Sequence, residues 1–433
     1  MTPPSKAKQA ESKLGPVAYL TGDYPKVSHT FILREVEALR ALGVDVRTCS
    51  IRTPDASEFR GEEELRARAE TFYVLAAARN PLRLLSSHWR AFRHNRQGWL
   101  SALALAWRIR APGMKALLWQ VFYFLEAGVL AEHLRSSGVR HLHNHFGNSS
   151  CSVALLTSMI SDIPFSFTEH GPAIFFEVDR WAIGEKVARA SFVVAISHFC
   201  RSQLMLFSRP EDWHKIAIVH CGVDPDAYGR APKSEPGKQV IFVGRMDPVK
   251  GTSLLVEAFV RVLAVHPDAH LTFVGDGPAR ARAEARVQEL GMAGSVTFAG
   301  FRAQPEVARL LDTADLLVLP SFAEGLPVVL MEALAARVPV IASRVAGVQE
   351  LVEDGENGFT IPPGDVESLV ARMTLLLADP ALRATLGQAG RDKVLAAFDI
   401  AQEAAWLGHL FEGSLAGTLP ASLRPPRETG GQG

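Results

Sequence analysis

The chain has few cysteines and no excess of either charge. Its 433 residues include 46 basic and 46 acidic side chains, so the formal net charge is zero. A dedicated nucleic-acid-binding protein carries a basic excess, so the balance argues against that class. The cysteines are far apart and match no zinc or redox spacing, so we expect buried thiols in a reducing compartment. They are Cys49, Cys151, Cys200 and Cys221.

Long hydrophobic runs are also missing. The first residues, MTPPSKAKQAESKLG, contain charges but lack the apolar core of a secretory signal. No run reaches the roughly 18 apolar residues that a membrane-spanning helix needs. We therefore expect a cytoplasmic protein, with flexible ends at 1–14 and 413–433. The two longest candidates, 98–111 and 116–131, are interrupted by Arg108, Arg110, Gln120 and Glu126.

Acidic residues are absent from Thr71 to Phe124, although basic residues and tryptophan are frequent there. This mixture at helical spacing suits the interface of an anionic membrane, where each basic group contributes about 1 kcal/mol. We expect a helical insertion at about 71–125 that docks peripherally on the inner face of the cell membrane. The alternative is a set of helices packed on the sheet, with solvated arginines. The residues are Arg79, Arg83, Arg90, Arg93, Arg96, Arg108, Arg110 and Lys115, with Trp89, Trp99, Trp107 and Trp119.

Short apolar, β-branched runs alternate with segments of helical periodicity along the chain. This alternation predicts parallel sheets covered by helices on both faces, and the length favours two such domains. The polar stretch GRAPKSEPGK at 229–238 is the expected linker. We expect an N-terminal domain at 15–228, a C-terminal domain at 239–396 and a last helix at 397–412. The expected strands are Val17–Thr21, Val44–Ile51, His141–His145, Phe165–Thr168, Phe192–Ile196, Ile216–Val219, Val240–Val243, Leu271–Val274, Val296–Phe298, Leu316–Leu319 and Val338–Ala342.

Two glutamates flank a Gly-Leu-Pro turn after the predicted strand Leu316–Leu319. In EGLPVVLME, Glu324 stands just before a helix that begins near Pro327, and Glu332 follows in its second turn. The free N–H groups and positive dipole end of that helix form an anion site, which Gly325 lets a ligand approach closely. Both carboxylates could accept hydrogen bonds from sugar hydroxyls. A single glutamate here would be explained by the helix dipole alone.

Two further loops follow strands in the same half of the chain. In VGRMDPVKG, Arg245 and Lys250 come after the strand-ending Gly244 and could together bind a diphosphate. In FVGDGP, Gly275 and Gly277 resemble the start of a dinucleotide fingerprint, but Arg280 occupies the position of its third small residue. A dinucleotide-dependent dehydrogenase is therefore disfavoured, and the two glycines are expected to keep the site open to a nucleotide.

The ordered segments GRMDPVKG, GDGP, FRAQPEVARLLDTADLLVLPS and EGLPVVLMEALA resemble the C-terminal domain of retaining glycosyltransferases of family four. The similarity covers about 235–395 closely. More loosely, YPKVSHTFI, HNHFG, EHG and HCGVD resemble the exopolysaccharide, colanic-acid-type branch of that family. This branch usually has Glu where the chain has His29. The resemblance implies the GT-B fold, an α/β architecture of two doubly wound domains that face a cleft.

The resemblance also implies roles for individual residues. Arg245 and Lys250 would hold the diphosphate of a nucleotide sugar, Glu332 the ribose and Glu324 the donor sugar. His170 would contact that sugar near the reacting carbon. The remaining donor-side positions would be Gly244, Gly275, Gly277, Phe301, Arg302, Gly325, Leu326 and Pro327. The acceptor side would include Gly22, Ser28, His29, Thr30 and His145.

The resulting hypothesis is sugar transfer to a glycan or lipid-linked acceptor, without a cofactor or metal. Asp224-Pro225-Asp226 imitates a metal-binding Asp-x-Asp motif but is interpreted as a turn. A zinc site at His141, His143 and His145 stays open from spacing alone, because alternate residues of a strand share a face. The functional alternatives are a nucleotide-sugar epimerase, a phosphorylase, and a non-catalytic partner of a polysaccharide assembly complex.

Overall fold

The computed structural model describes residues 14–26, 29–55, 61–229, 237–422 and 424, which form two compact units. Unit 1 contains the described residues up to Ile196, together with 201–219 and those from Ala401 onward. Unit 2 contains 197–200 and the described residues from His220 to Ile400. Ser28, residues 1–13 and most of the predicted linker lie outside the described residues.

Unit 1 is built on a seven-stranded parallel sheet with the order β3-β2-β1-β4-β5-β6-β7. Its inner strands are buried on both faces, as is usual for parallel sheets covered by helices. The strands are β1 (Val17–Asp23), β2 (Val46–Arg52), β3 (Phe72–Tyr73), β4 (His141–His145), β5 (Phe165–Glu169), β6 (Phe192–Ala195) and β7 (Ile216–Ile218).

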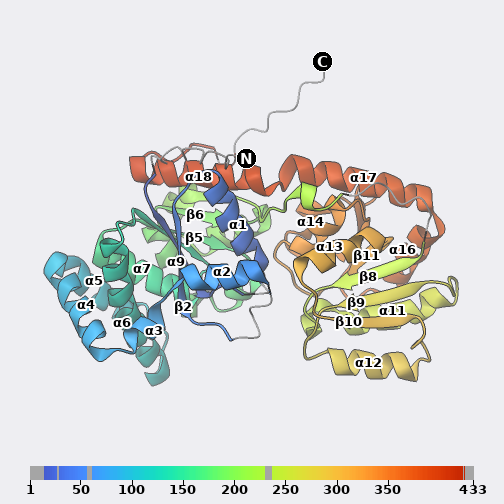
Figure 1. Ribbon diagram of the computed structural model, residues 1–433, viewed down its shortest axis with the longest axis horizontal. Helices are drawn as coiled ribbons and strands as arrows, with labels where there is room; N and C mark the ends of the chain where they lie inside the picture. Colours follow the sequence, from blue (N-terminus) through green and yellow to red (C-terminus); the bar gives the residue numbers. More distant parts are fainter. Residues whose placement is uncertain (1–13, 27–28, 56–60, 230–236, 423, 425–433) are drawn as a thin grey trace, which may run out of the picture. The chain divides into compact units, whose positions relative to one another are not determined.

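The two ends of the described chain share one core in unit 1. Helix α1 (Thr30–Ala41) and helix α18 (Ile400–Ala416) bury their apolar residues in the same cluster beside β1 and β6. Trp406 of α18 donates a hydrogen bond from Nε1 to the carbonyl of Ile218, at 3.1 Å. The last long helix therefore completes the core of the unit in which the chain begins (Figure 1).

The other helices of unit 1 connect successive strands of the sheet. A lobe of helices from α3 to α6 stands beside the sheet (Figure 1). The helices are α2 (Glu62–Glu70), α3 (Val74–Ala78), α4 (Pro81–His94), α5 (Arg96–Arg108), α6 (Met114–Ser136), α7 (Ser149–Ser161), α8 (Val178–Trp181), α9 (Ile183–Arg189) and α10 (His198–Leu206), with 3-10 turns η3 (Pro172–Phe176) and η4 (Pro210–Lys215). The first residues of α10, up to Cys200, belong to unit 2.

Unit 2 is built on a six-stranded parallel sheet with the order β10-β9-β8-β11-β12-β13. The strands are β8 (Gln239–Val243), β9 (His270–Val274), β10 (Val296–Gly300), β11 (Leu316–Leu319), β12 (Val340–Ser343) and β13 (Gly358–Ile361). The helices are α11 (Thr252–Leu263), α12 (Arg280–Glu289), α13 (Gln304–Thr313), α14 (Val328–Ala335), α15 (Val348–Leu351), α16 (Val366–Ala378) and α17 (Pro380–Ala397), with 3-10 turns η5 (Pro225–Ala227) and η6 (Pro248–Lys250).

Each sheet has a point at which the strand order reverses. In unit 1 the reversal lies between β1 and β4, and in unit 2 between β8 and β11. Ligands of open α/β sheets bind beyond the carboxyl ends of the strands at such a point. The topology therefore selects the loops after β8 and β11, which carry Arg245, Lys250 and Glu324.

The predicted α/β class with two parallel sheets is confirmed, and the eleven expected strands are present with ends shifted by a few residues. Two strands were missed. β3 has only two residues, and the short β13 begins with glycine after a turn. The predicted start at Val338 is wrong because Val338 still closes the preceding helix, donating its N–H to Ala333, and Pro339 follows.

The predicted absence of a span-length apolar segment needs a correction. Helix α6 has 23 residues, and by length and mean hydropathy it is a candidate membrane span, although its most apolar window is 44% buried. Gln120 and Glu126 interrupt its apolar sequence, so no uninterrupted run indicates a span here. Both side chains are buried, and α6 packs against α4 and α7. Buried core helices of soluble proteins can be equally long and apolar.

Burial gives Glu126 in α6 an unusual pKa, from which a pH dependence follows. Desolvation raises the pKa of Glu126 to about 7, opposed by Arg52, and its Oε2 has no hydrogen-bond partner among the described residues. A raised folded-state pKa stabilises the fold below about 4.5, and this contribution is lost as the pH rises through about 7. We expect Glu126→Gln to match wild type at pH 4.5 and to be about 2–3 kcal/mol more stable at pH 8. Denaturant unfolding at both pH values measures this, and parallel stability curves would contradict it.

Candidate functional site

The loops after β8 and β11 touch one another in unit 2. The backbone N–H of Phe322 donates to the carbonyl of Val249 at 2.7 Å. Gly251 has φ +67°, and a Cβ there would lie 2.1 Å from the carbonyl oxygen of Pro320. Only glycine combines this conformation with so close an approach. The two predicted donor-site loops therefore form one continuous surface.

Lys250 and Glu324 form the centre of this surface. The Nζ of Lys250 lies 2.7 Å from Oε1 of Glu324, which also accepts a hydrogen bond from the Ser321 hydroxyl at 2.6 Å. Glu324 is buried and Lys250 is about a quarter exposed. Because the carboxylate is fixed by two donors, it holds the ammonium group at a set place beside the start of α14. The sequence predicted both residues but not Ser321.

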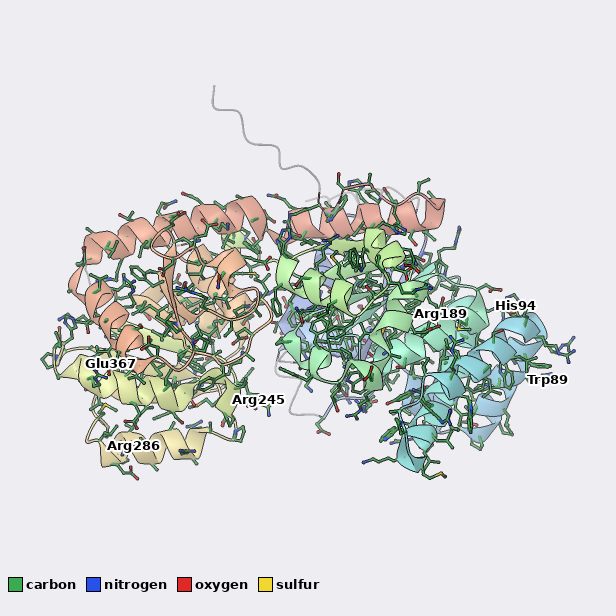
Figure 2. All side chains as sticks on the ribbon, turned by 180° about the vertical axis from the view of Figure 1, so that it is seen from behind. Trp89, His94, Arg189, Arg245, Arg286 and Glu367 are labelled. Atoms are coloured by element: carbon green, nitrogen blue, oxygen red, sulfur yellow. The ribbon has the colours of Figure 1, made fainter. Side chains whose placement is uncertain are left out.

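The second predicted cation is placed differently. Arg245 is 68% exposed and lies 3.4 Å from the carboxylate of Asp247, while Lys250 faces Glu324. In Figure 2 the Arg245 side chain projects from the edge of unit 2. The two cations lie in the same loop but do not share a partner. Binding of a diphosphate by both would therefore require Arg245 to leave Asp247, a weak exposed pair.

The glycines after β9 serve close packing between loops. Gly275 has φ +134°, and a Cβ there would lie 1.9 Å from the carbonyl of Gly244. At Gly277 a Cβ would lie 2.4 Å from the carbonyl of Met246, whose N–H donates to Asp276 at 2.8 Å. These two glycines thus let the loop after β9 support the loop that carries Arg245. The sequence pattern had indicated only an open floor for them.

Helix α14 begins where the sequence placed its start. Pro327 is the N-cap residue, and its carbonyl accepts from the N–H of Leu330 at 3.1 Å. The carbonyl of Gly325 accepts from Gly347 at 3.0 Å, which fixes the turn, and Leu326 is buried beneath it. The first N–H groups of this eight-residue helix come after the turn that begins at Glu324, so the predicted anion site lies close in sequence to the carboxylate that pairs with Lys250.

Glu332 lies in the second turn of α14 and is buried. Gln304 donates from Nε2 to Glu332 Oε1 and to the hydroxyl of Tyr228, the latter at 3.2 Å. The sequence missed both partners, although Gln304 stands in the FRAQPEV segment. Phe301 and Arg302 precede α13 nearby in sequence, and Arg302 is exposed and lies 3.9 Å from Glu306.

Unit 1 brings the predicted histidines together at its own switch point. His145 ends β4, and its Nδ1 lies 2.8 Å from Nε2 of His170, which follows β5. His29 lies at the start of α1, and the rings of His29 and His170 both contact Phe31 and Phe146, at centroid distances of 4.6–5.8 Å. Burial lowers the pKa of His29 to about 4 and that of His170 well below its usual range. Both imidazoles are therefore neutral at physiological pH.

Of the other predicted acceptor residues, the structure describes Gly22 and Thr30 but not Ser28. Gly22 is near the end of β1, and Thr30 opens α1. Phe146 is the residue directly after β4. Its φ of +71° is a strained backbone conformation for an aromatic residue. The sequence motifs contain Phe31 and Phe146 without assigning them a role. Phe31 stands in the first turn of α1.

A buried carboxylate holds the loop of His170. Glu169 accepts from the backbone N–H groups of Gly147, His170 and Gly171, at 2.7, 3.0 and 3.4 Å. Burial raises the pKa of Glu169 to about 7, and burial lowers the pKa of Lys186 to about 8. Lys186 donates to the carbonyls of Gly147 and Asn148. Glu169 therefore fixes the loops after β4 and β5 to each other, and Lys186 holds the loop after β4.

Among the described residues, Glu35, His143 and His145 could hold a metal by geometry, since their ligand atoms lie within 4.8 Å of one another. Both nitrogens of His143 are already occupied by hydroxyl groups, Ser166 at 2.8 Å and Thr168 at 2.9 Å. His141 is also buried and bonded to Ser166. The Asp224 side chain accepts from the N–H of Asp226 and caps η5, as a turn requires.

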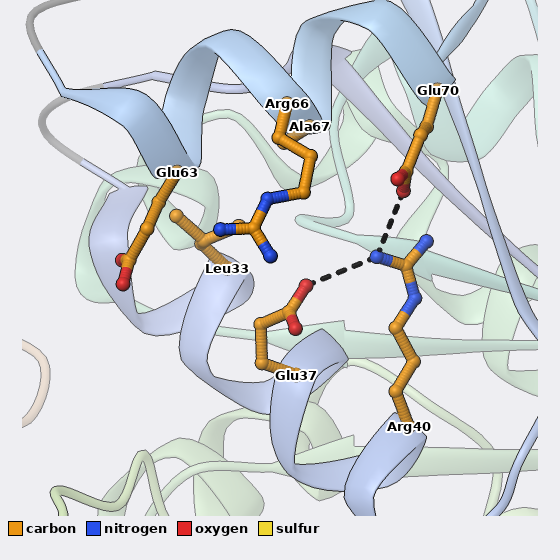
Figure 3. Close-up of a pocket in the computed structure, with 7 residues that line it drawn as sticks. All are labelled: Leu33, Glu37, Arg40, Glu63, Arg66, Ala67 and Glu70. Atoms are coloured by element: carbon orange, nitrogen blue, oxygen red, sulfur yellow. Dashed lines mark hydrogen bonds and ion pairs between the residues drawn. The ribbon is translucent and has the colours of Figure 1, made fainter. Parts of the chain in front are cut away.

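A small surface pocket lies away from these loops, between α1 and α2. Arg40 at its wall pairs with Glu37 at 3.0 Å and with Glu70 at 3.1 Å (Figure 3). These opposite charges satisfy one another, and the pocket contains none of the predicted site residues. The other lining residues are Leu33, Glu63, Arg66 and Ala67.

Family models match both units of this architecture. Residues 28–227 match the model described as Glycosyltransferase Family 4, and residues 228–393 match that of Glycosyl transferases group 1. The chain belongs to glycosyltransferase family four. The family predicted from the motifs is therefore confirmed, and so is the predicted similarity of this glycosyltransferase to the exopolysaccharide branch.

Curated relatives of the glycosyltransferase include two named for polysaccharide biosynthesis. The amylovoran biosynthesis glycosyltransferase AmsK of Erwinia amylovora is 25% identical over 88% of this chain and 96% of its own. The putative colanic acid biosynthesis glycosyltransferase WcaL of Salmonella typhimurium is 25% identical over 82% and 89%. The alpha-D-kanosaminyltransferase of Streptomyces kanamyceticus is 27% identical over 59% and 72%.

Solved structures confirm the GT-B fold of the glycosyltransferase. Sucrose-phosphate synthase from Thermosynechococcus elongatus superposes with a TM-score of 0.73 at 23% identity, covering 93% of this chain and all of that one. Anabaena Alr3699/HepE, in complex with UDP, gives 0.70 at 17% identity and covers 92% of this chain and all of that one. At these identities the likeness concerns the fold.

Proposed function

We propose that the enzyme transfers a sugar, with retention of anomeric configuration, from a nucleotide-diphosphate sugar to a glycan or lipid-linked acceptor in exopolysaccharide biosynthesis. The observation that carries the proposal is the Lys250–Glu324–Ser321 arrangement at the start of α14. The names of the amylovoran and colanic acid relatives support the process, and the UDP complex of the Anabaena neighbour supports the donor class.

The chemistry requires stabilisation of negative charge on the leaving group. When the bond from the anomeric carbon to the phosphate oxygen breaks, the sugar becomes cationic and the diphosphate more negative. Lys250, Arg245 and the free N–H groups of α14 neutralise that charge where it develops. Glu332, presented by Gln304, accepts hydrogen bonds from the ribose, and Glu324 from the donor sugar. We propose that these groups suffice without a metal.

The proposed transfer uses no nucleophile from the protein, and the acceptor proton leaves with the phosphate. The acceptor hydroxyl oxygen forms the new bond to the anomeric carbon, and its proton passes to the phosphate oxygen that leaves. His170 is assigned to a hydroxyl of the donor sugar. It is suited to this because burial keeps its imidazole neutral by lowering its pKa, so one nitrogen accepts while the other donates.

A panel of nucleotide sugars, tested for turnover with a lipid-linked glycan fraction, examines this proposal. We expect one donor to release its nucleoside diphosphate faster when acceptor is present. Donor isomerised without acceptor would instead indicate an epimerase, and absorbance of a lysine-bound pyridoxal phosphate would indicate a phosphorylase. Binding without turnover across the whole panel would favour a non-catalytic partner of an assembly complex.

We further propose that the enzyme is cytoplasmic and docks on an anionic membrane through α4, α5 and the first half of α6. Each of these helices exposes a row of large apolar side chains at helical spacing. The rows are Leu82, Leu85 and Trp89 in α4, Leu100, Leu103 and Trp107 in α5, and Met114, Leu118, Trp119, Val121 and Phe122 in α6. Figure 2 shows Trp89 projecting from the outer side of the lobe.

The charges of this docking surface support an anionic partner. Of the eight basic residues in 71–125, Arg90 pairs with Glu132 and Arg108 with Glu185. The other six have no acidic partner among the residues that the structure describes. Arg110 lies over the ring of Trp107, with its guanidinium carbon 3.9 Å from the ring centroid. Apolar rows flanked by unneutralised cations match the headgroup region of a charged bilayer.

Vesicle binding gives a testable expectation. The wild-type enzyme is expected to sediment with anionic vesicles at low salt and to dissociate as salt screens the charges. The double variant Trp89→Glu, Trp107→Glu is expected to bind at least about tenfold more weakly, because two interfacial anchors become repelling charges. Leu206→Glu, at an equally exposed position on α10, is the matched control. Failure of wild type to bind, or equal loss in the control, would contradict the docking surface.

A further inference from the structure

A chain of buried polar side chains runs from β1 to the loop of His170 in unit 1. The Tyr19 hydroxyl donates to Oε1 of Glu35 at 2.8 Å. The same oxygen lies 3.3 Å from Nε2 of His145, whose Nδ1 lies 2.8 Å from Nε2 of His170. All four residues are at least nine-tenths buried. Glu35 and Tyr19 were not among the predicted site residues.

The Glu35 carboxylate determines which nitrogens of His145 and His170 carry hydrogen. An ionised carboxylate only accepts, so it favours a proton on the nitrogen that faces it. His145 Nε2 faces Glu35 at 3.3 Å, outside the angles of a hydrogen bond, and has no hydrogen-bond partner among the described residues. With the proton on Nε2, His145 Nδ1 becomes an acceptor. His170 must then donate from Nε2, and its lone pair lies on Nδ1.

We propose that Glu35 is a positioning residue that, through His145, fixes His170 in the tautomer with its proton on Nε2. In this tautomer Nδ1 of His170 accepts a hydrogen bond from a hydroxyl group of the donor sugar. The inference rests on the proposed role of His170. Without the Glu35 charge, His145 and His170 can exchange donor and acceptor roles, and His170 presents an N–H in part of the molecules.

The contacts of α1 explain how Glu35 reaches this place. Glu35 lies four residues after Phe31, whose ring is 4.6 Å from that of His170 by centroids, so both point from one face of α1. Glu37 is two residues further on and faces the surface pocket instead, where it pairs with Arg40. The same helix therefore carries a buried glutamate that belongs to this series of polar side chains, and an exposed glutamate that does not.

This pair of glutamates provides a matched experiment. Glu35→Gln is expected to lower kcat by on the order of tenfold with little change in KM, because orientation is lost while binding remains. Glu37→Gln, the same substitution on the same helix, is expected to stay within about twofold of wild type. Circular dichroism and thermal midpoints establish that both variants are folded.

Nitrogen NMR of histidine-labelled protein supplies the readout that a purely structural role would not change. In wild type the His170 Nε2 is expected to carry the proton, and in Glu35→Gln a second tautomer appears. This result is independent of turnover, so failure of the proposed function does not decide it. A wild-type His170 protonated on Nδ1, or a tautomer unaffected by Glu35→Gln, overturns the inference. So does tightly bound zinc that Glu35→Gln abolishes, since the cluster would then be a metal site.

Discussion

Lys250→Ala is expected to lower kcat/KM for sugar transfer by at least about a hundredfold while the protein stays folded. Loss of one preorganised donor to a developing charge costs about 3 kcal/mol. Lys250 is held by Glu324 at 2.7 Å, so its position does not depend on the substrate. Arg245→Ala is expected to cause a comparable loss, and because Arg245 is 68% exposed its removal leaves the fold unchanged.

Steady-state kinetics with the donor identified from the panel measures both losses. Arg286→Ala is the matched control, since this arginine belongs to the same unit but pairs with Glu257 and Glu289 on the surface (Figure 2). It is expected to retain near wild-type turnover. If both Lys250→Ala and Arg245→Ala turn over normally, these two cations do not bind the diphosphate.

Glu324→Gln is expected to have an effect of similar size through a different cause. The amide keeps the shape of the side chain and its contact with Ser321 but removes the charge that fixes Lys250. It also weakens the hydrogen bonds that a carboxylate makes to sugar hydroxyls, because charge-assisted bonds are about twice as strong as neutral ones. We expect kcat to fall by about a hundredfold.

A double-mutant cycle separates the two causes. If Glu324 acts partly by holding Lys250, the variant that combines Glu324→Gln with Lys250→Ala will lose less than the two single losses multiplied together. Glu367→Gln is the control, because Glu367 forms an exposed ion pair with Arg261 at a distant part of unit 2 (Figure 2). Full additivity in the cycle would show that Glu324 and Lys250 act independently.

The fold was predictable because parallel sheets leave a strong signal in sequence. Runs such as Leu316–Leu319 are apolar throughout, and each precedes a segment of helical periodicity. Short elements escaped, since two residues of β3 bury too little to produce a pattern. α6 was misjudged for the opposite reason. Its Gln120 and Glu126 are buried, and sequence alone treats buried and exposed polar residues alike.

The candidate donor-site residues could be named from the sequence, but their partners could not. The glycine and proline that follow the strand Leu316–Leu319 are enough to indicate Glu324 and Glu332 from the amino-acid pattern. The pairing of Glu324 with Lys250 joins residues 74 positions apart, and the strand order brings them together only at the reversal between β8 and β11. Gln304 and Ser321 carry no distinctive spacing, so only geometry identifies them.

The histidines of unit 1 also have partners that their own sequence spacing does not reveal. Spacing on β4 placed His143 and His145 on one face and left a zinc site open. The structure adds Ser166 and Thr168 on β5, which occupy both nitrogens of His143. It also adds Glu35, which approaches His145 from α1. These neighbours belong to other elements, and their register is a tertiary property that the strand's own pattern does not contain.

Binding of a nucleotide diphosphate by the loops after β8 and β11 is the central claim, and calorimetry tests it most directly. With UDP and UDP-sugars as probes, in buffer containing a chelator, the full-length enzyme is expected to bind one equivalent. Lys250→Ala is expected to bind at least about tenfold more weakly, a difference of about 1.4 kcal/mol or more. Equal binding by wild type and Lys250→Ala would contradict this assignment of the donor site.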